Sequence, residues 1–320
     1  MTCRSNPMNK ERLIVAVILA LMSFPSLGCT SPDSLTIIVT GSVRGRVDEC
    51  ACPGSLVGGL GRRATVMAEH FPIRTGIAEQ SPIGLDCGRF LDIDPQGGRI
   101  ASQCMIRGLA KFGLKVMGPV PLDLFYGVNF LRSIADSAGV TLVSANLINS
   151  ASSDLIFQQW AVVTDRLTST KLAVTSLVKF HSGQRFTGGL DTWTVISPDS
   201  VIGDLSASIP EADFIVLLTD MSEFTLMEFL QDVTIFDLVI TSSRNVDTAS
   251  PFSIGRTVVV HPSPDGRTVD GIIISLDDSG VALNERIRWF SYPVSRGISP
   301  DETFSPWLDG CLGRRQVGRY

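Results

Sequence analysis

Aromatic residues, histidine and charged residues are all scarce in this 320-residue chain. Aromatic side chains make up 7% of the sequence and charged ones 18%, whereas 44% of the residues are hydrophobic. Valine, isoleucine and leucine supply most of the apolar mass, which excludes a disordered or fibrous chain and favours an ordered α/β protein. The chain has no internal repeat and no low-complexity segment, and its length suffices for one large domain or two small ones.

The N-terminal apolar run, LIVAVILALMSF (13–24), is too short to span a bilayer comfortably. It follows Arg4, Lys10 and Arg12, so the pattern predicts a secretory signal peptide over 1–28. The end of this segment resembles the lipobox of bacterial lipoproteins, with Cys29 as the acylated residue, although Ser26 stands where leucine is usual. The alternative is ordinary cleavage near Gly28, which would release a soluble secreted protein.

Lipidation of Cys29 predicts a protein held on a membrane by its N-terminal lipid, in the periplasm or on the outer membrane of a bacterium. Residues 29–34 would then form a short tether.

The chain also lacks a basic block. Loss of 1–28 removes three positive charges and one negative charge, which moves the net charge from −5 to −7. We therefore expect no nucleic-acid partner.

Hydrophobic patterning predicts strands that alternate with helices in the first half of the chain. The predicted strands are 35–40, 82–88, 114–118 and 140–147, and the predicted helices are 58–71, 99–113 and 121–139. An antiparallel meander is expected from the strand-like segments 157–166, 171–180 and 192–197. The α/β alternation then returns with helices over 199–209 and 222–232, and with strands over 212–220, 236–243, 256–262, 268–278 and 281–295.

These segments predict one domain over 35–300, followed by a C-terminal tail over 301–320 that packs back on it through Phe304 and Trp307. Crossover helices and hairpins together indicate two mixed β-sheets, packed face to face and flanked by helices. The expected fold is therefore a four-layer α-β-β-α sandwich.

Seven segments of the chain form an ordered series: LTIIVTGSVRGRV, GGLGRRATVMAE, IGLDCGRFLD, GLKVMGPVPLDL, TLVSANL, DLVITSSRNVD and DGRTVDGIIISLD. In this order they resemble the motifs of the calcineurin-like metallophosphoesterase family, specifically its 5′-nucleotidase-type branch. The resemblance covers most of 35–295 and implies the metallophosphoesterase fold. It also implies two divalent metal ions, which activate a water and clamp the phosphoryl oxygens.

The metal-ligand positions of that family carry mostly other residue types in this chain. The resemblance places them at Ser42, Arg44, Arg89, Pro119, Val120, near Asp220, and at Ser243 and Asn245. Of these, Asp220 is a good ligand for a hard cation and Asn245 is a weak one. For His70, His181 and His261, a surface or structural role is favoured over metal ligation. We therefore expect no metal pair and no other cofactor.

The loss of these ligands favours a non-catalytic binding or scaffold role in the cell envelope. The alternative is a metal-dependent phosphoric ester hydrolase of 5′-nucleotidase type, with a reduced or relocated site and a divalent metal pair. Arg44 and Arg89 are candidates for a metal-free site that binds phosphate or another small anion, because guanidinium groups fit such oxyanions. Alternatively, one of the two arginines pairs with Asp220 as a structural salt bridge.

Cysteine offers a second candidate site. In DECACPG (48–54), Cys50 and Cys52 could bind a soft metal or exchange thiols, or could form disulfides with other cysteines, Cys87 among them. Two carboxylates next to the family motifs, Asp86 and Asp123, are expected to serve as turn or capping residues.

Overall fold

The computed structural model describes residues 34–49, 58–71, 82–94, 96–179, 193–243, 251–276 and 282–314. All of them lie in the unit Pro32–Tyr320. The predicted signal peptide, the lipidation site and all but the last residue of the tether fall outside the described residues, as do Cys50, Cys52 and Asn245.

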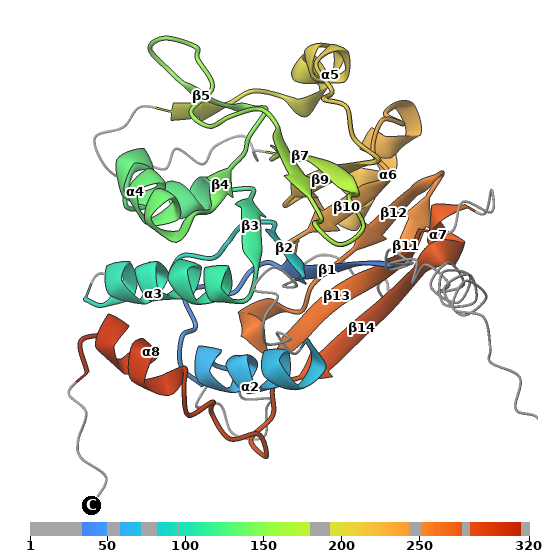
Figure 1. The fold of residues 1–320 in the computed structure, drawn as a ribbon. Coiled ribbons are helices and arrows are strands. Elements are labelled where there is room, and N and C mark those ends of the chain that lie inside the picture. The colour runs from blue at the N-terminus through green and yellow to red at the C-terminus, as the bar shows by residue number, and fades with distance from the viewer. Residues whose placement is uncertain are drawn as a thin grey trace, which may run out of the picture. The chain divides into compact units, whose positions relative to one another are not determined.

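The first large sheet joins the N-terminal part of the domain to its C-terminal part (Figure 1). Its six strands, in spatial order, are β14 (Ile287–Pro293), β13 (Thr268–Ser275), β1 (Ser34–Thr40), β2 (Ile83–Asp86), β3 (Leu114–Met117) and β4 (Thr141–Leu142). Strands β1 to β4 run parallel, whereas β13 and β14 are antiparallel to their neighbours. The parallel strands alternate along the chain with α2 (Leu60–His70), α3 (Gly98–Lys111) and α4 (Val128–Ala138).

The second large sheet also has a parallel centre. Its spatial order is β11 (Phe252–Ile254), β12 (Thr257–Val260), β10 (Leu238–Thr241), β9 (Phe214–Thr219), β7 (Lys171–Leu177) and β6 (Ala161–Thr164). The two edge strands, β11 and β6, are antiparallel to their neighbours. A separate pair, β5 (Leu147–Asn149) and β8 (Trp193–Val195), forms a short antiparallel ladder.

The core between the two sheets is built from aliphatic side chains of both. Alternate residues of β1, such as Ile37 and Val39, pack in one cluster with Val174, Val216 and Ile240 of the second sheet. The outer face of the first sheet is covered by α2, α3 and α4, and that of the second by α5 (Pro198–Ala207) and α6 (Glu223–Asp232). The predicted four-layer sandwich is confirmed, and none of the described helices is long and apolar enough to cross a bilayer.

Several predicted elements differ from the observed ones. The helix predicted over 121–139 is divided into a 3₁₀ turn, η1 (Pro121–Leu124), and α4, because the chain turns at Gly127 with φ of 90°. The strand predicted over 140–147 is two short strands, β4 and β5, separated by a segment in which Asn146 bonds the carbonyls of Val178 and Ile196.

The predicted meander is wrong beyond its first hairpin. β6 and β7 do pair antiparallel, but β8 pairs with β5, and the other edge of β7 pairs in parallel with β9. The side chains of β7 after its first residue are all buried, on both faces of the strand, which is typical of a central parallel strand.

The C-terminal segment packs on the outer helices, as Phe304 and Trp307 predict. Phe304 stacks on Phe112 with ring centroids 5.1 Å apart, and the helix that follows is α8 (Ser305–Cys311). A disulfide between Cys104 of α3 and Cys311 fixes this helix. The remaining two short elements are η2 (Pro264–Gly266) and α7 (Leu283–Arg286).

The expectation that Cys87 takes part in a disulfide is corrected by the structure. Cys87 is a free, fully buried cysteine whose Sγ donates to the carbonyl oxygen of Thr40 at 3.3 Å. It packs among the aliphatic residues between the two sheets, and burial raises the pKa of its thiol well above the usual range. A thiol in such surroundings stays protonated and is a poor nucleophile.

The disulfide predicts a measurable loss of stability on reduction. Its two cysteines are 207 residues apart in sequence, so the crosslink restricts a long loop of the unfolded chain. We expect Cys104→Ser/Cys311→Ser to lower the free energy of unfolding by about 2–5 kcal/mol in urea titrations. Reductant should shift the wild-type midpoint and leave that of the double variant unchanged. Peptide mapping without reduction that finds both thiols free would contradict the crosslink.

Candidate functional site

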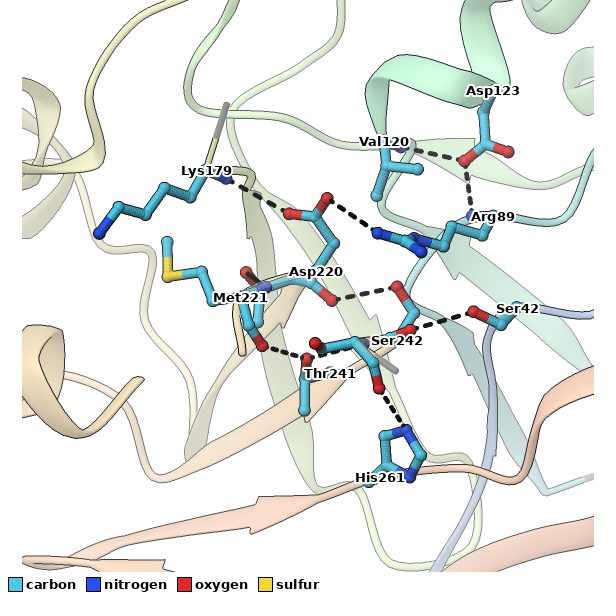
Figure 2. Close-up of polar contacts among 12 residues, drawn as sticks. Ser42, Arg89, Val120, Asp123, Lys179, Asp220, Met221, Thr241, Ser242 and His261 are labelled. Carbon is cyan, nitrogen blue, oxygen red and sulfur yellow. Dashed lines mark hydrogen bonds and ion pairs between the residues drawn. The ribbon is translucent and has the colours of Figure 1, made fainter. Parts of the chain in front are cut away.

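The predicted site positions follow the carboxyl ends of strands in both sheets. Figure 2 shows residues that follow six different strands: Ser42 after β1, Arg89 after β2, Val120 after β3, Asp220 after β9, Ser242 after β10 and His261 after β12. Carboxyl ends of parallel strands share one edge of a sheet, and such edges hold the binding sites of open α/β folds. The two sheets therefore contribute to one location.

Two contacts join the first sheet to the second at this location. The hydroxyl of Ser42 donates to the carbonyl oxygen of Ser242 at 3.0 Å, and both residues are buried. Nη2 of Arg89 lies 3.9 Å from Oδ2 of Asp220 (Figure 2). The other carboxylate oxygen of Asp220 accepts the backbone N–H of Lys179 at 3.3 Å. The salt bridge considered from the sequence is thus present, with Arg89 as the cation.

Some of the remaining predicted positions lie beside these contacts and others do not. Pro119 is buried beside Val120, and the carbonyl oxygen of Ser243 lies 2.6 Å from Nε2 of His261. Nη2 of Arg44 lies 3.3 Å from Oδ1 of Asp265, a carboxylate that follows β12. The two candidate arginines thus pair with different carboxylates.

The carboxylate of Asp123 joins two loops of the site through hydrogen bonds. Its carboxylate is fully buried and accepts four backbone N–H groups: those of Val120 at 3.0 Å, Arg89 at 2.8 Å, Phe90 at 3.0 Å and Leu91 at 3.3 Å. Three backbone bonds then attach the loop after β1 to the same segment: Ser42 to Gly88, Arg44 to Arg89 and Gly45 to Phe90. The turn role expected for Asp123 is therefore seen, and it spans two loops.

The backbone at these positions adopts an uncommon conformation. Ser42, Arg44 and Arg89 have φ values of 53°, 50° and 59°. These values lie in the left-handed region, which residues other than glycine, asparagine and aspartate rarely occupy. Each such residue costs on the order of 1–3 kcal/mol and persists where the surroundings impose it. Here the loop-to-loop hydrogen bonds impose it, and all three residues stand where the resemblance places metal ligands.

Burial raises the pKa of the two buried carboxyl groups next to the site, those of Asp86 and Asp123. Asp86 accepts the Thr40 hydroxyl at 2.6 Å and the Gly88 N–H at 2.8 Å, yet desolvation raises its pKa to about 7. Desolvation likewise raises the pKa of Asp123 to about 6, although its four backbone donors act in the opposite direction. Asp86 therefore titrates near neutral pH inside the folded protein.

The residues at the family's ligand positions do not fit a pair of divalent cations. They supply two hydroxyls, two guanidinium groups, two apolar side chains, one carboxylate and, outside the described residues, one amide, whereas hard cations need several converging oxygen or imidazole ligands. Within the described residues, no group of three or more His, Cys, Asp or Glu side chains is arranged to hold a metal ion.

Sequence reasoning missed one contributor near the site. The ring of His261 reaches the carbonyl oxygen of Ser243, which is a contact of the structural kind expected for this histidine. Asp265 is not singled out by the sequence at all, although it binds Arg44, Arg46 and Arg267. The available signal is the charged turn Asp265-Gly266-Arg267 within the seventh motif segment.

Comparison with known proteins identifies the fold. No protein-family model matches the sequence, and no curated protein matches it either. Among solved structures, a Thermus thermophilus sulfate thiohydrolase, SoxB, superposes with a TM-score of 0.67 at 14% identity, over 91% of this chain and 61% of its own. A 5′-nucleotidase precursor, also from Thermus thermophilus, gives 0.67 at 15% identity, over 88% and 58%.

A third structure matches along nearly its whole length. The calcineurin-like phosphoesterase YfkN from Bacillus subtilis gives a TM-score of 0.63 at 16% identity, over 88% of this chain and 96% of its own. The chain thus has the fold of calcineurin-like phosphoesterases and 5′-nucleotidases, and it spans less than two thirds of the first two structures.

The raised pKa of Asp86 predicts a pH dependence of stability. Between pH ~4, where an unfolded aspartate titrates, and pH 7, the folded state holds a proton that the unfolded state releases. The free energy of unfolding should therefore fall as pH rises through this window, by at most about 1.4 kcal/mol per pH unit for one proton. Asp86→Asn, which keeps an acceptor for Gly88, should flatten the urea-unfolding profile between pH 5 and 8.

The control for this measurement is Asp204→Asn, because Asp204 is an exposed residue of α5. Its profile should follow that of the wild type. Parallel profiles for wild type and Asp86→Asn would show that Asp86 does not carry the proton.

Proposed function

We propose that this chain is an exported protein of the bacterial cell envelope in which a metallophosphoesterase fold serves binding or scaffolding instead of hydrolysis. The observation that carries the proposal is the ion pair between Arg89 and Asp220. The first residue stands where the resemblance places a bridging carboxylate, and the second is the one good hard-metal ligand among the matched positions.

Electrostatics supports this proposal. A guanidinium is charged at every physiological pH, so it repels a divalent cation and offers it no lone pair. Asp220 is 12% exposed and Arg89 is 31% exposed, so their pair contributes about 1 kcal/mol or less to stability. Its main consequence is to occupy the carboxylate that a metal would need.

The alternative function is a metal-dependent phosphoric ester hydrolase with a reduced or relocated site. It draws on the likeness in fold to a 5′-nucleotidase precursor and to a calcineurin-like phosphoesterase. It requires a divalent metal pair, for which Asp220 and Asn245 remain the candidate ligands. The donor chemistry at the strand ends favours the non-catalytic role.

Export and membrane attachment rest on the N-terminal sequence. The basic start, the short apolar run and Cys29 after Gly28 support a lipoprotein signal. The Cys104–Cys311 disulfide agrees with this, because disulfides persist in oxidising compartments. The membrane is therefore the first partner we propose, through the lipid on Cys29, and nucleic acid is not a proposed partner.

Metal content and hydrolysis test the non-catalytic role. We expect the purified protein, supplied with Mn²⁺, to hold less than one metal ion per chain by mass spectrometry. Hydrolysis of p-nitrophenyl phosphate, of its diester and of adenosine monophosphate should not exceed the buffer rate, because the ligands of a metal pair are replaced.

A matched pair of carboxylate variants identifies the source of any activity. Stoichiometric metal together with turnover that Asp220→Ala abolishes, and that the exposed-site control Asp204→Ala retains, would overturn the non-catalytic proposal. Turnover equal in both variants would indicate a contaminating enzyme and would leave the proposal standing.

Lipidation is tested at a single residue. Cys29→Ser removes the thiol that would carry the lipid, so the protein should move from the membrane fraction of the producing bacterium to the soluble fraction. Mass spectrometry of the wild-type N-terminal peptide should show acyl chains on Cys29. Wild-type protein that begins after Gly28 without acyl chains would instead support ordinary cleavage and secretion.

A further inference from the structure

One arginine is buried behind the first sheet without a direct partner for its side chain. Arg63, near the start of α2, is 4% exposed. Its backbone N–H donates to the carbonyl oxygen of Gly59 at 3.0 Å, but its guanidinium makes no hydrogen bond and no ion pair with the residues that the structure describes. Each of its three nitrogens borders space that a water molecule can reach. Because buried donors without acceptors are costly, this guanidinium needs an acceptor.

A small cavity lies beside this arginine, between the first sheet and the helices α2 and α3. Two of the residues that line it, Arg63 and Thr40, have polar side chains. The other lining residues are apolar: Ile38, Met67, Gly84, Leu109, Phe112 and Leu114. The space inside is about that of one water molecule. We call it the Arg63 cavity; it has room for a single small ligand and two side chains that can hydrogen-bond to one.

Gly84 explains why the sheet leaves space at this point. It lies in the buried strand β2 and lines the cavity without contributing a side chain to it. A Cβ added at Gly84 would come within 2.6 Å of Cα of Leu114, and β2 and β3 shift register between Gly84 and Leu85. The close approach of the two strands excludes a larger residue here. The cavity is therefore a consequence of how the strands pair.

Two buried carboxylates already balance the charge of Arg63. Burial lowers the pKa of this arginine, and the charges of Asp270 and Asp86 act in the opposite direction. Asp270 has hydrogen bonds of its own, from one backbone N–H and two hydroxyls at 2.6–2.7 Å. The guanidinium thus lacks an acceptor and not a counter-charge. An anion would add a further negative charge next to two carboxylates, whereas a water molecule supplies the acceptor without charge.

Thr40 is the second polar side chain of the cavity and connects it to the loops of the site. Its hydroxyl donates to Oδ2 of Asp86 at 2.6 Å, so the lone pairs of the hydroxyl oxygen are left to accept a hydrogen bond. Oδ1 of Asp86 accepts the backbone N–H of Gly88 at 2.8 Å, and the carbonyl oxygen of Gly88 accepts that of Ser42 at 2.8 Å. A chain of hydrogen bonds therefore runs from the cavity wall to the loop after β1.

We propose that the Arg63 cavity binds one structural water molecule, which accepts an N–H of Arg63 and donates to the hydroxyl oxygen of Thr40. The water joins α2 to the hydrogen-bond chain through Asp86 that ends on the site loops. Arg63 thereby becomes a positioning residue for those loops, although it lies on the opposite side of the first sheet from the second. The proposal does not depend on the function proposed above, because it holds whether or not the chain hydrolyses phosphoesters.

Two crystal structures of the wild type test the water site, one of untreated crystals and one of crystals soaked in sodium bromide, at a resolution that shows buried waters. We expect a single density peak about 2.7–3.2 Å from a nitrogen of Arg63 and from Oγ1 of Thr40. The soaked crystals should show no anomalous bromide signal at this peak, because the neighbouring carboxylates disfavour an anion.

Two variants test the link to the site loops in solution. Arg63→Met removes the donors, and Thr40→Val removes the second partner of the water while keeping the shape of the side chain. In both variants, hydrogen exchange at the Gly88 N–H should accelerate about threefold or more relative to that of Leu217, a buried residue of β9 in the second sheet. The control Arg288→Met removes an exposed arginine of β14 and should leave this ratio unchanged.

Several outcomes would overturn the proposal. A cavity without density, in a map that shows other buried waters, would mean that Arg63 has no such ligand, and an anomalous bromide peak would assign the cavity to an anion. Direct contact between the guanidinium and a carboxylate would remove the need for a water. Exchange at Gly88 that follows exchange at Leu217 in both variants would show that the cavity is not coupled to the loops. If Arg63→Met does not fold, the wild-type crystals and Thr40→Val still decide.

Discussion

The carboxylate of Asp123 is the interaction on which the geometry of the site depends. Loops that leave the carboxyl ends of parallel strands carry backbone N–H groups that no strand can satisfy, and leaving such groups buried and unpaired is costly. Asp123 accepts four of them, three from the segment that starts at Arg89. The carbonyl oxygens of Gly88, Arg89 and Phe90 in turn accept the backbone N–H groups of Ser42, Arg44 and Gly45. The shape of the site therefore comes from main-chain bonds that no metal ligand has to supply.

The backbone geometry of the site therefore depends little on which side chains its loops carry. Ser42, Arg44 and Arg89 keep left-handed backbone conformations, which are costly for residues of these types. The energy that maintains them comes from the loop-to-loop bonds and from the buried core, which substitutions of the side chains leave in place. Two of these side chains lie against carboxylates: Arg89 lies against Asp220, and Arg44 lies against Asp265. The result is a metallophosphoesterase fold whose strand ends hold ion pairs.

The sequence was sufficient for the layers and for most helices and strands, because these depend on local periodicity. It was insufficient wherever a partner is distant. Strand β8 pairs with β5, more than forty residues earlier in the chain, so the predicted pairing of β8 with β7 was wrong. The helix break at Gly127 lies within a continuous amphipathic pattern, which hides it from sequence analysis. The contact between Arg44 and Asp265 spans 221 residues, and that between Cys104 and Cys311 spans 207. Neither spacing leaves a signal in a single sequence. The site positions themselves were found from motif order, whereas the partner of each arginine required the fold.

The most direct measurement is a crystal structure of the protein soaked with Mn²⁺ and phosphate, with data collected at the manganese absorption edge. The Arg89–Asp220 pair predicts no anomalous peak within coordination distance of Asp220. Two manganese peaks between Ser42, Asp220 and Ser243, with the Arg89 side chain displaced from Asp220, would contradict the proposal that an ion pair stands here in place of a metal pair.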